Sequence, residues 1–321
     1  MNQTFPRPVV VTSKCLEFDA CRFNGQVISD SFVRGLKQHV HFIMVCPEVE
    51  IGLGTPREPI RLVGRGEALS LVQPATDRDV TAEMQSFSQT FLGNLPDVDG
   101  FILKSRSPSC GPKDVRIYSE KGMPMSSGSG LFAQAVLDNF PGLAIEDEGR
   151  LRNFRIREHY LTKLFALARF REVQATKSMR ALVHYQTTNK LIFMAYNQAS
   201  MRRLGQIVAN AEKNPIETVM EAYKNELTNT FSRIPKIGSN INVLMHALGY
   251  FSKKLSSREK AFFLDELEKY RQMKVPLSAI LNVLSAWIAR FDEKYLSKQT
   301  FFEPYPLALL EISDSGKGRE L

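Results

Sequence analysis

Four cysteines are the side chains of this sequence best suited to chemistry, and three of them closely follow short apolar runs. The runs are brief, contain β-branched residues and end in turn residues, which predicts buried strands at 9–11, 42–45 and 101–103. The cysteines that follow them are Cys15, Cys46 and Cys110. Because ligand sites in an open parallel sheet form beyond the carboxyl ends of the strands, we expect these thiols to converge. Cys21, in the same loop as Cys15, is a candidate fourth member.

The spacing of the cysteines alone leaves two interpretations open. Successive cysteines are separated by 5, 24 and 63 residues and form no C-x-x-C pair, so the sequence has no zinc-finger or ferredoxin pattern. Buried structural cysteines and a metal site are equally compatible with that spacing. The expected convergence favours a metal site, since three thiolates can hold an ion or a cluster and leave one coordination position open, as a catalytic centre requires.

Polar residues close to these cysteines add candidate catalytic groups. Glu48 lies two residues after Cys46 and can face the same cavity, although a salt-bridged or helix-capping carboxylate is the alternative. Residues 104–109 supply hydroxyls and two cations directly before Cys110, and there Ser107 can equally be a turn residue before a proline. The serines and glycines of 126–130 precede a predicted helix, where free N–H groups bind anions, but an ordinary loop fits them as well.

The first half of the chain alternates between strand and helix patterns. Helices are predicted at 31–39, 81–92 and 131–137, a hairpin at 59–73, and an inter-domain linker at the acidic stretch 141–149. Strands separated by helices indicate an α/β, Rossmann-like domain with a mostly parallel sheet, which we place at residues 1–150.

The second half shows apolar residues at three- and four-residue spacing almost throughout, interrupted before Pro215, Pro235 and Pro276. This pattern predicts helices joined by short turns, and therefore an all-α domain at residues 151–321. Two domains also suit a chain of 321 residues.

Charge divides the chain in the same way. Residues 1–150 carry 15 Lys and Arg against 18 Asp and Glu, a net charge of −3, whereas residues 151–321 carry 27 against 16, a net charge of +11. A hydrophobic fraction of 43% excludes a disordered chain, and four cysteines are too few for a disulfide-rich mini-protein. No secretion signal or membrane-spanning run is evident, so we expect a cytoplasmic protein without membrane association.

Five short segments occur in order along the first half: Thr12-Ser13-Lys14-Cys15-Leu16, Cys21-Arg22-Phe23-Asn24-Gly25, Cys46-Pro47-Glu48, Gly54-Thr55-Pro56-Arg57 and Ser107-Pro108-Ser109-Cys110-Gly111. Together they resemble the motifs of the thiouracil desulfidase (TudS) family. The second half, with His184, Asn189-Lys190, Met194-Ala195-Tyr196 and Leu204-Gly205, is similar to the helical domain often fused behind that domain, and the pair resembles the tRNA-thiouridine desulfidases called RudS. Phe23-Asn24 departs from the Tyr-Asp usual in the family, which affects the shape of the pocket rather than the cofactor.

The resemblance implies one 4Fe-4S cluster per chain, with one iron left open. Matched motif by motif, its ligands are Cys15, Cys46 and Cys110, and Cys21 is outside the set. The motifs also imply that Glu48 and Ser107 are catalytic.

The reaction implied by the resemblance is hydrolysis of a thiocarbonyl without net redox change. The soft sulfur of the substrate suits iron, Glu48 would activate water, and Ser107 would donate a hydrogen bond or relay a proton. We expect the substrate to contact Ser13, Arg106 and Ser109.

The positive charge of the helical half predicts a nucleic-acid partner. The resemblance implies that this partner is tRNA containing thiouridine. Family resemblance favours 4-thiouridine. Free thiolated bases or nucleotides, or a cluster-bearing sensor without turnover, are the alternatives, and no obligate protein partner is evident. Candidate phosphate contacts are Arg180, Lys190, Arg202 and Arg203, and candidate base-stacking residues are His184, Tyr185 and Tyr196.

Overall fold

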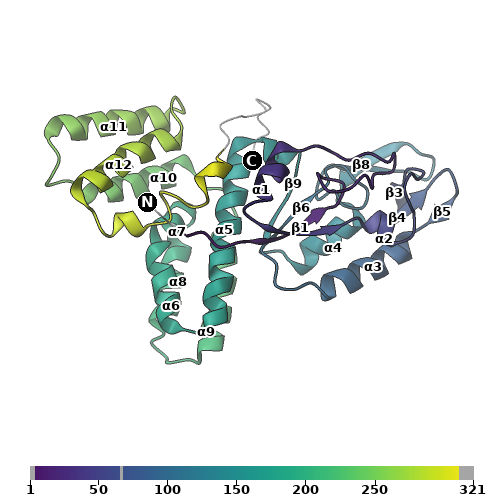
Figure 1. Cartoon of the computed structure of the whole chain (residues 1–321), viewed down its shortest axis with the longest axis horizontal. Coiled ribbons are helices and arrows are strands. Elements are labelled where there is room, and N and C mark those ends of the chain that lie inside the picture. Colours follow the sequence, from purple (N-terminus) through teal and green to yellow (C-terminus); the bar gives the residue numbers. More distant parts are fainter. Residues whose placement is uncertain (1–3, 66–67, 311–321) are drawn as a thin grey trace. The chain divides into compact units, whose positions relative to one another are not determined.

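The computed structural model describes residues 4–65 and 68–310. The chain divides into two compact units, one built on Pro6–Ala168 and the other on Arg169–Tyr305 (Figure 1). The expected classes are confirmed, since an α/β unit with a parallel sheet precedes an all-α unit. The functional boundary that we place at residue 150 stays a prediction.

The first unit is organised by a four-stranded, wholly parallel sheet with the order β2-β1-β6-β9. Its strands are β1 (Val9–Ser13), β2 (His41–Val45), β6 (Gly100–Leu103) and β9 (Ala144–Asp147). The chain moves outward from β1 first to β2 on one side and then to β6 and β9 on the other. The switch in direction therefore falls between β1 and β6, where an open α/β sheet leaves a crevice at its carboxyl edge.

Alternating residues of β6 show that helices cover both faces of this sheet. Phe101 and Leu103 point into a core with α3 (Thr81–Gly93) and α4 (Leu131–Asn139), which contact each other through aromatic rings. Gly100 faces the opposite side of the sheet, where it packs against Leu164 of α5 (Phe154–Thr176). On that α5 segment Tyr160 contacts Phe32 of α1 (Ser31–Leu36). The helices on both faces of the sheet hold the carboxyl ends of its strands in place.

A second sheet of the first unit has the order β5-β4-β3-β7-β8. Its strands are β3 (Arg61–Arg65), β4 (Ala68–Gln73), β5 (Arg78–Asp79), β7 (Val115–Tyr118) and β8 (Pro124–Gly128). The predicted hairpin is confirmed as the antiparallel pair β3–β4. Residues 66–67, between the two strands in the sequence, lie outside the described ranges.

Two segments of the first unit differ from the sequence-based expectation. The acidic stretch 141–149, predicted as a linker, contains β9, because backbone pairing with β6 overrides its low strand propensity. The stretch 126–130 is neither an anion site nor an ordinary loop. Ser126 and Ser127 lie in β8, and the N–H groups of Gly130, Leu131 and Ala133 donate to carbonyls of residues 108–111. The first turn of α4 therefore holds the loop that carries Cys110.

The second unit is all helical. After the last residues of α5 it contains α6 (Met179–Thr188), α7 (Lys190–Tyr196), α8 (Gln198–Ala209), α9 (Ile216–Thr230), α10 (Ile237–Gly249), α11 (Ser257–Arg271) and α12 (Leu277–Phe291). The prolines predicted to separate helices precede α9, α10 and α12. Tyr185 is buried among Phe170, Phe193 and Tyr223, so it is a core residue and unavailable for base stacking. Within the described residues, no helix is long and apolar enough to cross a membrane.

Close packing of Gly130 against the loop of Cys110 gives a test of the fold. A Cβ at Gly130 would lie 2.5 Å from the Ser109 carbonyl oxygen and 2.7 Å from that of Pro108. We expect Gly130→Ala to lower the free energy of unfolding by about 1–3 kcal/mol, because backbone atoms must move to relieve the overlap. Denaturant titration measures the change. Gly93→Ala, at the end of α3 with open space around it, is the matched control and should be neutral or slightly stabilising. Equal effects of both changes would contradict the packing argument.

Candidate functional site

Four buried thiols line one cavity of about 840 Å³ in the first unit. Cys15 follows β1, Cys46 follows β2 as the N-cap residue of α2 (Pro47–Glu50), and Cys110 lies in the loop after β6. The convergence expected for an open parallel sheet is present at the carboxyl edge of the sheet. Cys21, which lies outside the predicted ligand set, lines the same cavity, and its carbonyl accepts a hydrogen bond from the Cys46 Sγ at 3.7 Å.

The surroundings of the thiols favour their protonated forms. A hydrogen bond with Cys15 raises the pKa of Cys21 to about 11, with burial adding to the shift. A hydrogen bond with Cys21 and burial raise the pKa of Cys46, and burial raises that of Cys110. Because thiolate is the form that binds metal, metal uptake at this site must release protons.

The donor set fits an iron–sulfur cluster, since three soft thiol donors follow three separate strands and line one cavity. Within residues 4–65 and 68–310, no three His, Cys, Asp or Glu side chains are grouped so that they could hold one metal ion.

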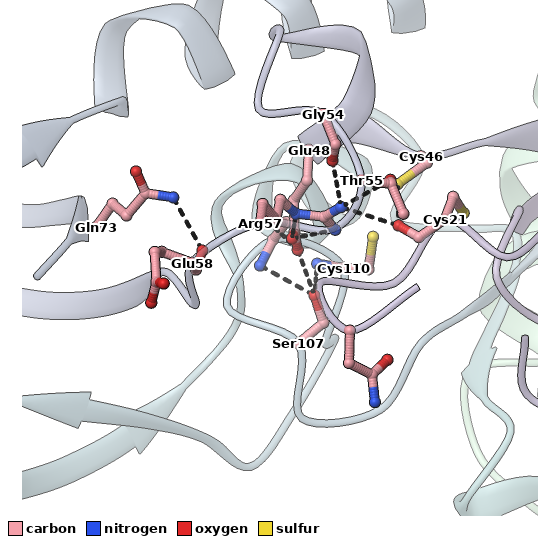
Figure 2. Close-up of polar contacts among 12 residues, drawn as sticks. Cys21, Cys46, Glu48, Gly54, Thr55, Arg57, Glu58, Gln73, Ser107 and Cys110 are labelled. Carbon is pink, nitrogen blue, oxygen red and sulfur yellow. Dashed lines mark hydrogen bonds and ion pairs between the residues drawn. The ribbon is translucent and has the colours of Figure 1, made fainter. Parts of the chain in front are cut away.

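Glu48 connects the cavity wall to two neighbouring segments (Figure 2). Its Oε1 accepts hydrogen bonds from the Ser109 Oγ at 2.9 Å and the Ser107 Oγ at 3.4 Å. Its Oε2 accepts from the Nε and Nη2 of Arg57 at 2.9 and 2.6 Å. The carboxylate is therefore salt-bridged and sits in the first turn of α2, and it also lines the cavity, while its catalytic role stays a prediction.

Ser107 and Ser109 of the Cys110 loop have different positions. Ser107 lines the cavity, and its Oγ accepts hydrogen bonds from the N–H groups of Ser109 and Cys110 at 3.2 and 3.1 Å, as a turn residue does. Ser109 has no exposed surface and does not line the cavity. Its contact with Glu48 thus takes the place of the substrate contact that we predicted from the sequence.

Ser13 and Arg106, the other predicted substrate contacts, both line the cavity. Ser13 is buried at the end of β1, where its Oγ accepts from the Lys104 N–H at 2.9 Å and so ties β1 to the chain after β6. Arg106 is exposed. Together with Lys113 and Arg152 it forms a set of exposed cations on the cavity wall that make no ion pair with any described residue.

Comparison with known proteins identifies the family of the first unit. The sequence model of the family described as 2-thiouracil desulfurase matches residues 10–148. The uncharacterized protein YbbK of Bacillus subtilis (strain 168) is 32% identical over 132 residues, which are 39% of this chain and 87% of that protein. Through these residues the chain belongs to the 2-thiouracil desulfurase family. A solved structure described as a [4Fe-4S]-dependent thiouracil desulfidase, TudS, is 30% identical, with a TM-score of 0.36, and the match covers 45% of this chain and 93% of TudS.

A second family model matches the helical part. It is described as a protein of unknown function (DUF1722) and covers residues 190–306. The uncharacterized protein YbgA of Escherichia coli (strain K12) is 29% identical over 164 residues, which are 50% of this chain and 96% of that protein. The two matched segments, residues 10–148 and 190–306, thus lie in different units of the chain.

The predicted phosphate contacts lie outside the desulfurase module, on three consecutive helices of the second unit. Arg180 is on α6, Lys190 begins α7, and Arg202 and Arg203 are on α8. All four side chains are exposed. Arg203 is engaged by Glu226 at 2.8 Å, which leaves it the least available of the four. Their role in RNA binding stays a prediction.

Sequence reasoning assigned no role to Arg57, although it is the closest partner of Glu48 in the desulfurase module. The segment Gly54-Thr55-Pro56-Arg57 belongs to the family motifs, which is the one signal that pointed to it. Its contact with Glu48 depends on the path of the loop after α2, which the spacing of residues does not specify.

Asp147, at the end of β9, supplies a pH-dependent test of the cavity. Burial raises the pKa of this carboxyl to about 6 from an ordinary value of 3.8. The folded protein therefore holds the Asp147 proton more tightly than the unfolded chain, and stability falls as the pH rises from about 4 to about 6. We expect Asp147→Asn to raise the free energy of unfolding near pH 7 by about 1–3 kcal/mol and to have little effect below pH about 4. Denaturant titrations across this range measure both values.

The exposed Asp138 of α4 offers the matched control, since Asp138→Asn removes a carboxylate that is already solvated. A gain in stability for Asp147→Asn that does not vary with pH would show that burial of the charge is not its cause.

Proposed function

We propose that this protein removes sulfur from thiouridine in tRNA, with 4-thiouridine as the favoured base, to give uridine and sulfide. The observation that carries the proposal is the meeting of buried thiols and the Glu48 Oε1 in one cavity of a desulfurase-family module. At about 840 Å³ the cavity is in the range of sites for drug-sized ligands, so it has room for a nucleotide and not only for a base.

Cys15, Cys46 and Cys110 would hold a 4Fe-4S cluster. When bound, the cluster supplies a soft Lewis-acidic iron for the thiocarbonyl sulfur. Because the thiols come from three strand ends fixed by the sheet, the protein holds the site in place from three directions.

Glu48 would act as the base that takes a proton from water. The water oxygen forms the new bond to the pyrimidine carbon, the carbon–sulfur bond breaks, and sulfur leaves as hydrosulfide. Thiocarbonyl and water are thereby exchanged for carbonyl and hydrogen sulfide, with no electrons transferred. Ser109 holds Oε1 from behind the cavity wall, whereas Ser107 reaches the cavity and can relay the proton.

The charge of the second half of the chain supports RNA as the form of the substrate. Residues 151–321 carry a net charge of +11, and Arg180, Lys190 and Arg202 are exposed on neighbouring helices. A strongly basic module is what binding to a polyanion requires, whereas a free base needs none.

A free thiouridine nucleotide is the second candidate substrate. Arg106, Lys113 and Arg152 lie in the cavity of the desulfurase module itself. A nucleotide phosphate could pair with them without any contribution from the helical unit.

Variants of Cys46 and Glu48 separate cofactor binding from catalysis. We expect Cys46→Ala to lose the cluster absorbance and all turnover. Glu48→Gln should keep the absorbance and lose turnover by roughly 10²-fold or more, because the amide cannot accept the proton from water. Anaerobic reconstitution followed by visible spectroscopy, iron analysis and sulfide release provides these measurements. Cluster absorbance that survives in Cys46→Ala would show that the ligand set is wrong.

The choice between substrates rests on turnover of thiolated tRNA and of free 4-thiouridine and its monophosphate. We expect sulfide release from tRNA, measured together with the loss of thio-base absorbance. The double change Arg180→Glu and Arg202→Glu should weaken tRNA binding and reduce its salt slope by about 1 per lost phosphate contact, with free-base turnover unchanged.

Arg258→Glu on α11, an exposed arginine outside the predicted set, controls for net charge. Turnover of the monophosphate but not of tRNA would move the proposal to the free nucleotide. Binding of tRNA without turnover of any substrate would indicate a sensor.

A further inference from the structure

We propose that Arg57 is the positioning residue of this site, which orients the Glu48 carboxylate so that one chosen oxygen handles the proton. The inference rests on the proposed function for the role of Glu48. Its geometric basis is independent of that function.

The ion pair between Arg57 and Glu48 is shielded from water. The Arg57 side chain is 4% exposed and the Glu48 side chain 13%. An ion pair removed from solvent in this way loses little to screening, so its geometry is held far more firmly than that of a surface pair. Removing one partner leaves the other charge buried without compensation.

The contact is unusual in that two guanidinium donors meet a single carboxylate oxygen. Nε and Nη2 both donate to Oε2, at 2.9 and 2.6 Å, instead of dividing between the two oxygens. Oε1 is left to the serine hydroxyls on the opposite side. The two oxygens of Glu48 therefore have separate hydrogen-bond partners, and the arginine determines that Oε1 faces Ser107 at the cavity wall.

Arg57 is itself fixed by main-chain carbonyls. Its Nη1 donates to the carbonyl oxygens of Cys21 and Gly54, each at 2.9 Å, and its own N–H donates to the carbonyl of Phe23 at 2.8 Å (Figure 2). Two of these acceptors belong to the loop that begins at Cys15. Arg57 consequently joins the thiol-bearing first loop to the proposed base, and the position of one depends on that of the other.

Only an arginine can make all these contacts at once. The planar guanidinium offers five donors in fixed directions, whereas a lysine ammonium is a point charge on a flexible chain. A lysine at position 57 would keep the charge beside Glu48 but lose the paired donors on Oε2 or the carbonyl contacts.

The experiment compares Arg57→Lys and Arg57→Ala with wild type, all reconstituted with the cluster. We expect both variants to retain cluster absorbance and iron content. The kcat should fall about 10-fold in Arg57→Lys and about 100-fold in Arg57→Ala, with KM changed much less, because general-base catalysis depends on the orientation of the base. Methylguanidinium, added well below denaturing concentrations, should partly restore kcat of Arg57→Ala and leave Arg57→Lys unaffected.

Arg61→Ala is the matched control, since Arg61 is an exposed arginine of β3 that contacts the Tyr118 ring and not Glu48. It should leave kcat and KM unchanged. An Arg57→Lys variant as active as wild type, or a loss of cluster together with activity in both Arg57 variants, would overturn the positioning role.

A thermal double-mutant cycle with Glu48→Gln and Arg57→Gln keeps the inference distinct from the proposed function. If the two side chains are coupled as described, the melting temperature of the double variant is no lower than that of the less stable single variant. This result does not depend on which substrate the protein acts on. Additive losses in melting temperature would overturn the coupling. If the cycle shows coupling but the wild-type protein turns over no thiolated substrate, the proposed function is rejected and the coupling is retained.

Discussion

The carboxylate of Glu48 has to be compensated, because it is mostly removed from water and lies beside buried thiols. A carboxylate in that position is tolerated only when its lone pairs are satisfied. One oxygen is paired with a shielded arginine and the other with two serine hydroxyls. The loop after α2, the loop before Cys110 and the first loop of the chain must all be in place for this to happen. The ion pair and the thiol pocket are therefore one cooperative arrangement.

The sheet makes that arrangement possible by bringing three loops to one edge. With the order β2-β1-β6-β9, the change of direction between β1 and β6 places the loops after β1, β2 and β6 around one crevice. The loop with Cys110 then needs its own support, since it lies beyond the last hydrogen bond of β6. The first turn of α4 provides it by donating N–H groups to the carbonyls of that loop. Gly130 is required there because any Cβ would occupy the space of the Ser109 carbonyl.

Sequence-based predictions were correct where the residue pattern and the sheet topology agree. They were lacking for contacts that depend on the path of a loop. Short apolar runs predicted β1, β2 and β6, and the expected parallel sheet then predicted that the cysteines following these strands converge. The strands β7, β8 and β9 were missed because Pro124–Gly128 and Ala144–Asp147 are polar or short, and pairing with neighbouring strands forms them. Tyr185 was misassigned since helical periodicity does not show which aromatic rings of a helix reach the core. The Arg57 contact depends on the loop after α2, which has no periodicity to analyse.

The distribution of positive charge separates two recognition problems. In the first unit, Arg106, Lys113 and Arg152 belong to the same cavity as the thiols, so an anion bound to them would lie beside Glu48, the proposed base. In the helical unit, Arg180, Lys190 and Arg202 are exposed on α6, α7 and α8, where they offer weak, salt-sensitive contacts. The first pattern suits recognition of the nucleotide that reacts, and the second suits retention of a long polyanion. The proposed substrate, a nucleotide within tRNA, would need both, which is why the charge of the helical half bears on what the cysteine-bearing half is proposed to act upon.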